Sequence, residues 1–152
     1  MAYEHKWLSP AEVIRVVDGD TIEVILDLGY DTYRKEVIRF RRINAYEVKM
    51  YKGVTAAQKK KGIAGKEFLK GLIEGKRAYI RTYKEKTRGS LRRYLGEVYV
   101  LSAGTPLVKT ADIKALRMSK DETSERSAAK IINLHNVNDL MVDLGFAVYK
   151  KY

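Results

Sequence analysis

Hydrophobic and polar positions alternate, or β-branched residues cluster, in five short segments of the chain. Turn residues bound most of these segments, and both features are typical of β-strands. The first two segments flank Asp18-Gly19-Asp20, which indicates a β-hairpin with a tight turn. We therefore predict five strands, at residues 13–17, 21–26, 36–43, 77–83 and 94–101.

The third predicted strand carries charges on a face that is otherwise apolar. Arg39 and Arg41 share this face with Val37 and Ile43, because side chains two apart in a strand point the same way. Burying an unpaired charge is costly, so one of these arginines must reach water, a carboxylate or a ligand.

Two further segments have the pattern of helices. In residues 55–75 apolar residues recur four apart, Thr55 can cap the beginning and Gly75 can end the helix. Residues 138–145 predict a short helix with an asparagine cap, Asn138, and a terminal glycine. Three glycines lower the helix propensity of the longer segment, namely Gly62, Gly65 and Gly71.

Five strands interrupted by helices predict an α+β, mainly β fold. We expect a five-stranded barrel like the OB-fold, with a helix after the third strand and a short helix near the C-terminus. The length predicts a single domain, residues 1–152, with its core at about 11–101 and 133–149. Residues 102–132 are charged and weakly patterned, so we expect a mobile excursion. Two short helices are expected within it, at residues 112–118 and 124–132.

The net charge of +11 favours a polyanionic partner such as DNA or RNA, and a merely solvated basic surface is the alternative. The chain has no cysteine, which excludes disulfides and thiolate metal sites. Its two histidines argue against a zinc site built on several histidines. No apolar run approaches the roughly 20 residues that cross a bilayer, and the first residues do not resemble a signal peptide. We therefore expect a cytoplasmic protein that has no membrane partner.

Basic residues dominate the stretch from Lys76 to Arg93, which holds a single acid, Glu85, and interleaved tyrosines. Cations that follow a phosphate backbone, with aromatic rings nearby for base stacking, are typical of a groove for single-stranded nucleic acid. An exposed basic hairpin whose tyrosines pack in the barrel explains the same pattern. The two interpretations can both hold.

Carboxylates gather at the first turn and after the third strand. Asp18 and Asp20 lie two residues apart, Thr21 adds a hydroxyl, and Glu47 follows the strand that carries Arg39. Hard divalent cations prefer such oxygen ligands. Acids beside arginines in a basic chain therefore indicate a metal that bridges the protein to a phosphate. Taken alone, the Asp-Gly-Asp stretch is better explained as a common hairpin turn than as a metal site, so the metal interpretation depends on the combination.

This combination resembles the staphylococcal, or thermonuclease, family. The resemblance rests on three blocks in a fixed order, VIRVVDGDTIEV, IRFRRINAYEV and RRYLGEVYV, and on a weaker fourth block, VNDLMVDLGFAV. The predicted helix at residues 55–75 also lies where the family has its first helix. The blocks cover about residues 11–101 and 133–149.

The resemblance implies an enzyme that hydrolyses phosphodiester bonds of DNA or RNA with one calcium ion on an OB-fold. By position, Arg39 and Arg93 would clamp the scissile phosphate, and Glu47 would act as, or orient, the general base for water. The calcium ion would bind Asp20, with Asp18 supporting it in the same turn. Thr21 would contribute through a water molecule.

The chain departs from the family at the second metal-binding aspartate, where it has Asn44. Asparagine offers an oxygen without charge, so we expect weaker calcium binding. The stretch that in the family ends in Tyr-Gly-Arg is Leu-Arg-Arg here, and spacing favours Arg93 over Arg92 as the clamp. Further nucleic-acid contacts are expected from Lys84, Arg88 and Arg92, and from Tyr149, which only loosely matches a base-contacting tyrosine.

Two functions from different classes follow. The first is a monomeric, calcium-dependent nuclease that acts on single-stranded or double-stranded DNA or RNA. The alternative is a nucleic-acid-binding OB module that has lost catalysis, which Asn44 and the altered loop before Arg93 favour.

Overall fold

A computed structural model of the chain describes four stretches, residues 8–47, 53–86, 94–101 and 134–150. The predicted excursion at residues 102–132, with its two expected helices, lies outside the described residues. Among the described helices, none is long and apolar enough to span a membrane.

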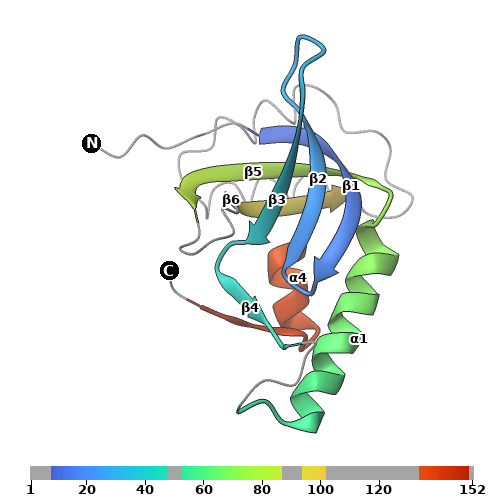
Figure 1. Cartoon of the computed structure of the whole chain (residues 1–152), viewed down its shortest axis with the longest axis vertical. Coiled ribbons are helices and arrows are strands. Elements are labelled where there is room, and N and C mark those ends of the chain that lie inside the picture. Colours follow the sequence, from blue (N-terminus) through green and yellow to red (C-terminus); the bar gives the residue numbers. More distant parts are fainter. Residues whose placement is uncertain (1–7, 48–52, 87–93, 102–133, 151–152) are drawn as a thin grey trace.

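A closed barrel of five strands forms the body of the structure (Figure 1). Its strands are β1 (Leu8–Asp18), β2 (Thr21–Asp27), β3 (Tyr33–Phe40), β5 (Arg77–Lys86) and β6 (Tyr94–Leu101). The first three form an antiparallel meander, and β5 pairs with the free edge of β1 and with β6. A parallel pairing of β3 with β6, in which Ile38 lies opposite Tyr94, closes the barrel. This confirms the predicted mainly β, OB-like barrel.

The third strand ends earlier than predicted. Its extended backbone stops at Phe40, and Arg42 adopts a left-handed conformation with φ of 70°. The chain then starts a separate short strand, β4 (Ile43–Ala45), which pairs with β8 (Ala147–Tyr149). The predicted strand at 36–43, with Arg39 and Arg41 on one face, is therefore wrong in its last residues, because a turn interrupts the alternation.

Helix α1 (Ala56–Ile73) begins with a capping box, in which the hydroxyl of Thr55 accepts from the Gln58 amide and the Gln58 side chain accepts from the Thr55 amide. Its C-terminal end is fixed to β1, where the Gly75 amide donates to the Val13 carbonyl at 2.8 Å. Gly75 has φ of +75°, which suits the predicted helix stop. The predicted helix is thus confirmed despite its three glycines.

Helix α4 (Val137–Asp143) follows the short strand β7 (Leu134–Asn136) and lies below the barrel in Figure 1. Its cap is Asn136, whose side chain accepts from the Asp139 amide at 2.9 Å. The predicted cap, Asn138, is wrong: this residue lies two positions later, fully buried in the first turn of α4, and its amide joins α4 to the barrel. Strands β7 and β8 were not predicted.

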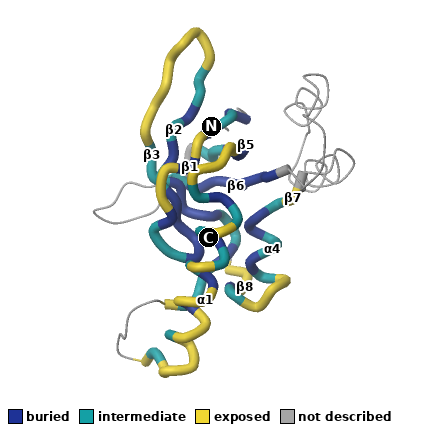
Figure 2. The backbone as a smooth tube through the Cα atoms, turned by 90° about the vertical axis from the view of Figure 1, so that its right-hand side faces the viewer, coloured by how far each residue is buried: buried dark blue, intermediate teal, exposed yellow. Residues whose placement is uncertain are grey.

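The hydrophobic core lies inside the barrel and continues beneath it to both helices. Figure 2 shows buried residues along the barrel strands and exposed ones at the tip of the β2–β3 hairpin and along much of α1. The strands contribute aliphatic side chains and the rings of Phe40 and Tyr99, and both helices add further apolar side chains. The fully buried members include Val13, Ile22, Val24, Ile38, Phe40, Ile43, Leu69, Ile73, Ile80, Val98, Val137 and Met141.

Candidate active site

The turn between β1 and β2 is packed against β4. The Asp20 amide donates to Oδ1 of Asp18 at 3.1 Å, which fixes the first carboxylate beside the second. Gly19 permits the packing, because a Cβ there would lie 2.9 Å from the Cβ of Ala45. The sequence Asp-Gly-Asp therefore forms a turn whose two acids are held at one end of the barrel.

Asp20 is 6% exposed and ties this turn to the two strands that follow it. Its Oδ1 accepts from the Thr21 hydroxyl at 3.0 Å. Its Oδ2 accepts from the Ala45 amide at 2.8 Å and from Nη1 of Arg39 at 2.9 Å. The carboxylate thus occupies the centre of the predicted site.

Arg39 is 7% exposed and points into this centre from β3. Besides Asp20 Oδ2, its Nη1 donates to the carbonyl of Phe40 at 3.2 Å and, at 3.4 Å, to that of Asp20. Its Nη2 donates to Oδ1 of Asn44 at 3.0 Å. The expectation that one of the strand's arginines reaches a carboxylate is confirmed, and oxygens from three residues surround the guanidinium.

The strand register explains why these residues meet. Thr21 lies opposite Asp18 across the first hairpin and opposite Arg39 across the second. The turn at residues 41–42 then folds β4 back toward the same end of the barrel. Five predicted site residues are therefore in one hydrogen-bonded cluster: Asp18, Asp20, Thr21, Arg39 and Asn44.

The electrostatics of this cluster are dominated by the burial of Asp20. Burial, together with the neighbouring Asp18, raises the pKa of Asp20 from 3.8 to about 7, although Arg39 acts in the opposite direction. A pKa in this range means that the nearby positive charge does not fully compensate for burying the carboxylate. Additional positive charge close to Asp20 would therefore stabilise its ionised form.

The other predicted residues are placed less completely. Glu47 is exposed two residues after β4, and its backbone lies against α1. Lys84 lies in β5, where only its backbone is described. Tyr149 is 56% exposed in β8, and its hydroxyl donates to Asp139 at 3.0 Å. The remaining candidates lie outside the described residues, namely Arg88, Arg92 and Arg93.

Comparison with known proteins identifies no relative: no family model matches the chain, and no curated protein matches it. The likeness to the staphylococcal nuclease family therefore rests on the sequence blocks alone and stays a prediction. The function has to be argued from the chemistry of the cluster itself.

That chemistry fits a hard cation of modest affinity. Asp18 and Asp20 supply carboxylate oxygens and Asn44 an amide oxygen, and these are ligands that calcium prefers. Among the described residues, no group of three or more histidine, cysteine, aspartate or glutamate side chains could hold a metal. The site thus offers two charged ligands, and Arg39 already contacts both Asp20 and Asn44. A cation would share these oxygens with a guanidinium, which favours weak binding.

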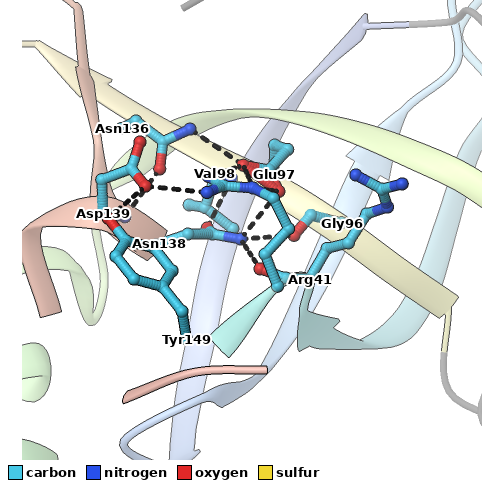
Figure 3. Close-up of polar contacts among 9 residues, drawn as sticks. Arg41, Gly96, Glu97, Val98, Asn136, Asn138, Asp139 and Tyr149 are labelled. Atoms are coloured by element: carbon cyan, nitrogen blue, oxygen red, sulfur yellow. Dashed lines mark hydrogen bonds and ion pairs between the residues drawn. The ribbon is translucent and has the colours of Figure 1, made fainter. Parts of the chain in front are cut away.

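A second polar cluster, around Arg42, was not predicted (Figure 3). Glu97 is 1% exposed and accepts from Nε of Arg42 at 3.1 Å, while Nη1 of Arg42 donates to Asp139 at 2.9 Å. The amides of Asn136 and Asn138 also donate to Glu97, at 3.0 and 3.1 Å. The one signal for this cluster was an acid in the middle of the apolar strand YLGEVYVL.

Asn138 extends this cluster into the backbone. As Figure 3 shows, its side chain lies between the turn after β3 and strand β6. The amide nitrogen donates to the carbonyls of Arg41 and Gly96 at 2.9 and 3.0 Å, and the oxygen accepts from the Val98 amide at 3.1 Å. This fixes the turn that leads from Arg39 to Asn44.

Proposed function

We propose that the protein is a calcium-dependent nuclease that hydrolyses phosphodiester bonds of DNA or RNA. One observation carries the proposal: oxygen ligands from Asp18, Asp20 and Asn44 converge with the guanidinium of Arg39 at one end of the barrel. A phosphodiester is anionic and repels an attacking hydroxide. A site that combines a cation with arginines offsets this charge, and does so more strongly as it grows in the transition state.

Each side chain has a role in this proposal. Asp18, Asp20 and Asn44 would hold one calcium ion, with Thr21 supporting it, and the ion would supply Lewis-acid charge at the phosphate. Arg39 would donate to a phosphate oxygen, and the planar fork of a guanidinium suits this contact better than an ammonium. Arg93 is assigned the same task from its position in the sequence.

Glu47 is assigned to the attacking water. Its exposed carboxylate would accept a proton from water as the water oxygen bonds to phosphorus. The bond from phosphorus to the leaving sugar oxygen then breaks, and that oxygen takes up a proton. Glu47 lies three residues after Asn44, on the segment that β4 delivers to the same end of the barrel.

Charge outside the site supports a nucleic-acid substrate. The chain carries a net charge of +11, and the basic stretch that includes Lys84, Arg88 and Arg92 adjoins the proposed clamp, Arg93. Such residues follow a phosphate backbone without reading its sequence. We propose that the protein acts as a monomer, and the cytoplasm stays the location expected from the sequence.

One observation favours the alternative, a nucleic-acid-binding module without catalysis. The side-chain oxygen of Asn44 accepts a hydrogen bond from Arg39 at 3.0 Å. The residue that stands where the resemblance places a charged metal ligand thus binds the arginine instead. An amide there can orient Arg39 without contributing charge to a metal. The choice between enzyme and binding module therefore depends on position 44.

The decisive experiment measures cleavage of single-stranded DNA across a calcium titration. Three proteins are compared: the chain as it stands, Asn44→Asp and Glu47→Ala. Cleavage that requires millimolar calcium, needs less of it in Asn44→Asp and vanishes in Glu47→Ala supports the nuclease. Cleavage by Asn44→Asp alone supports the binding module, and full activity in Glu47→Ala contradicts the assigned base.

A further inference from the structure

Helix α1 contacts the chain segment that carries Glu47 through a glycine. Gly62 is buried in the second turn of the helix. A Cβ at this position would lie 2.1 Å from the carbonyl oxygen of Glu47, 2.6 Å from its carbonyl carbon and 2.6 Å from the carbonyl oxygen of Tyr46. All three atoms belong to the backbone, so no side-chain rotation would relieve the overlap. Only glycine lets the helix and this segment lie so close together.

The same segment is restrained on other sides. The Tyr46 amide donates to the carbonyl of Phe146 at 3.3 Å, and Nζ of Lys61 lies 5.2 Å from the centre of the Tyr46 ring. Phe146 packs in turn on Gly65, where a Cβ would lie 3.0 Å from the Phe146 Cβ. The helix face formed by Gly62 and Gly65 therefore seats both the segment at residues 46–47 and the turn before β8.

Gly71, in the same helix, differs from these two glycines. No atom lies within 4 Å of the position that its Cβ would occupy, and the residue is exposed. Glycine is among the least favourable residues in a helix interior, so each of the three weakens α1 by a similar intrinsic amount. Of the three, only Gly62 and Gly65 allow another part of the chain to pack closely against the helix.

We propose that Gly62 is a positioning residue for the active site. Because Gly62 has no side chain, the main chain of Glu47 can lie against the helix, and this contact fixes the distance between the Glu47 carboxylate and the attacking water. Gly62 itself touches neither substrate nor metal. The inference rests on the proposed nuclease activity, in which Glu47 is the base, and it adds a residue in α1 that none of the sequence motifs included.

The test compares Gly62→Ala with Gly71→Ala, which makes the same chemical change in open space. In Gly62→Ala the segment must move by roughly 1 Å, and displacements of that size cost about 10- to 100-fold in rate. We expect kcat on single-stranded DNA to fall by that factor and KM to stay within about twofold, because the basic residues that bind phosphate are unchanged. Gly71→Ala should keep the parent's kcat and KM.

A double substitution separates positioning from general stability. If Gly62 acts through Glu47, Gly62→Ala in a Glu47→Asp background, which keeps a carboxylate and a measurable kcat, should lower kcat by a smaller factor than in the parent. Gly65→Ala supplies the structural control, because it disturbs Phe146 and should lower the melting temperature more than kcat. An equal loss of kcat in the parent and in the Glu47→Asp background, or equal changes of kcat in Gly62→Ala and Gly71→Ala, would overturn the proposal.

Two further measurements are the kcat of Glu47→Asp and the amide NMR shifts of the segment at residues 46–47. Should Gly62→Ala not fold, Glu47→Asp shortens the side chain by one methylene and should lower kcat by a similar factor; unchanged kcat would refute the need for a fixed distance. Should the parent not cleave DNA at all, the proposed function fails. The amide NMR shifts of residues 46 and 47 then still report whether Gly62→Ala, and not Gly71→Ala, displaces the segment; unchanged shifts would refute the seating as well.

Discussion

Arg39 and Arg42 are three residues apart, and each binds a buried carboxylate, yet the neutral groups that complete the two clusters differ. Around Arg39 the neutral groups present oxygens: the side chain of Asn44 and the carbonyls of Asp20 and Phe40. Around Glu97, the partner of Arg42, the neutral groups present N–H donors instead. These donors belong to Asn136 and Asn138.

The comparison shows which pair is complete within the fold. Glu97 accepts from the guanidinium of Arg42 and from two neutral amides, so the fold itself supplies its partners, although burial still raises its pKa. The first cluster is a cation enclosed by oxygens, with a second acid, Asp18, beside the first. Carboxylate, amide and carbonyl oxygens are also the kinds of ligand that a hard metal ion prefers. We therefore propose the cluster around Arg39, and not the one around Arg42, as the functional site.

The largest expected effect comes from breaking the complete pair. Glu97→Ala leaves the guanidinium of Arg42 with Asp139 as its remaining acid and removes an acceptor of the Asn136 and Asn138 amides. We expect the free energy of unfolding, measured by denaturant titration, to fall by about 3–5 kcal/mol. Glu23→Ala is the matched control, because Glu23 pairs with exposed Arg15 and Lys35. It should leave the unfolding midpoint almost unchanged. Similar midpoints for the two variants would show that the Arg42 cluster is not structural.

The second effect is smaller and depends on pH. Because the pKa of Asp20 is raised from 3.8 to about 7, the folded protein holds this proton more tightly than the unfolded chain. The stability that Asp20 contributes is therefore fully present below about pH 4 and is lost as the pH rises through about 7. We expect a decline on the order of 2–4 kcal/mol across this window in the absence of calcium.

Asp20→Asn should lack that decline, since asparagine does not titrate. Denaturant unfolding at several pH values between about 4 and 8 measures both profiles. Asp31→Asn, at the exposed tip of the β2–β3 hairpin, serves as the control and should follow the parent. Parallel profiles for Asp20→Asn and the parent would mean that Asp20 does not control this part of the pH dependence.

The contrast between the two pairs also explains what the sequence could predict. Asp18, Asp20 and Thr21 are neighbours in the chain, and a hairpin turn brings them together, so their pattern was visible locally. Arg39 lies beside them because of the strand register, and one short turn brings Asn44 to the same place. The barrel was predictable for the same reason, since hairpins and strand periods are local signals.

The Arg42 cluster was not predictable in this way. Arg42 and Glu97 are 55 residues apart, and the left-handed turn that aims Arg42 at Glu97 has no glycine or proline to mark it. Asn136 and Asn138 are equally good caps by composition, and tertiary contacts assign the cap to the first. The role of Gly62 was not predictable either. From the sequence this glycine only lowers the helix propensity of α1, because its contact with the backbone of Glu47 is tertiary.

The smallest expected effect concerns Tyr149, which links the second cluster to the predicted nucleic-acid contacts. Its hydroxyl donates to Asp139, and its half-exposed ring lies 5.9 Å from the Arg42 guanidinium carbon. Tyr149→Phe removes only the hydrogen bond, so unfolding should become easier by about 0.5–1 kcal/mol, with DNA affinity unchanged. Tyr149→Ala also removes the ring, and if a base stacks there, affinity for single-stranded DNA should fall about tenfold. Fluorescence titration at constant salt measures both affinities. Equal affinities for the two variants would restrict Tyr149 to a structural role and leave the recognition of bases to other residues.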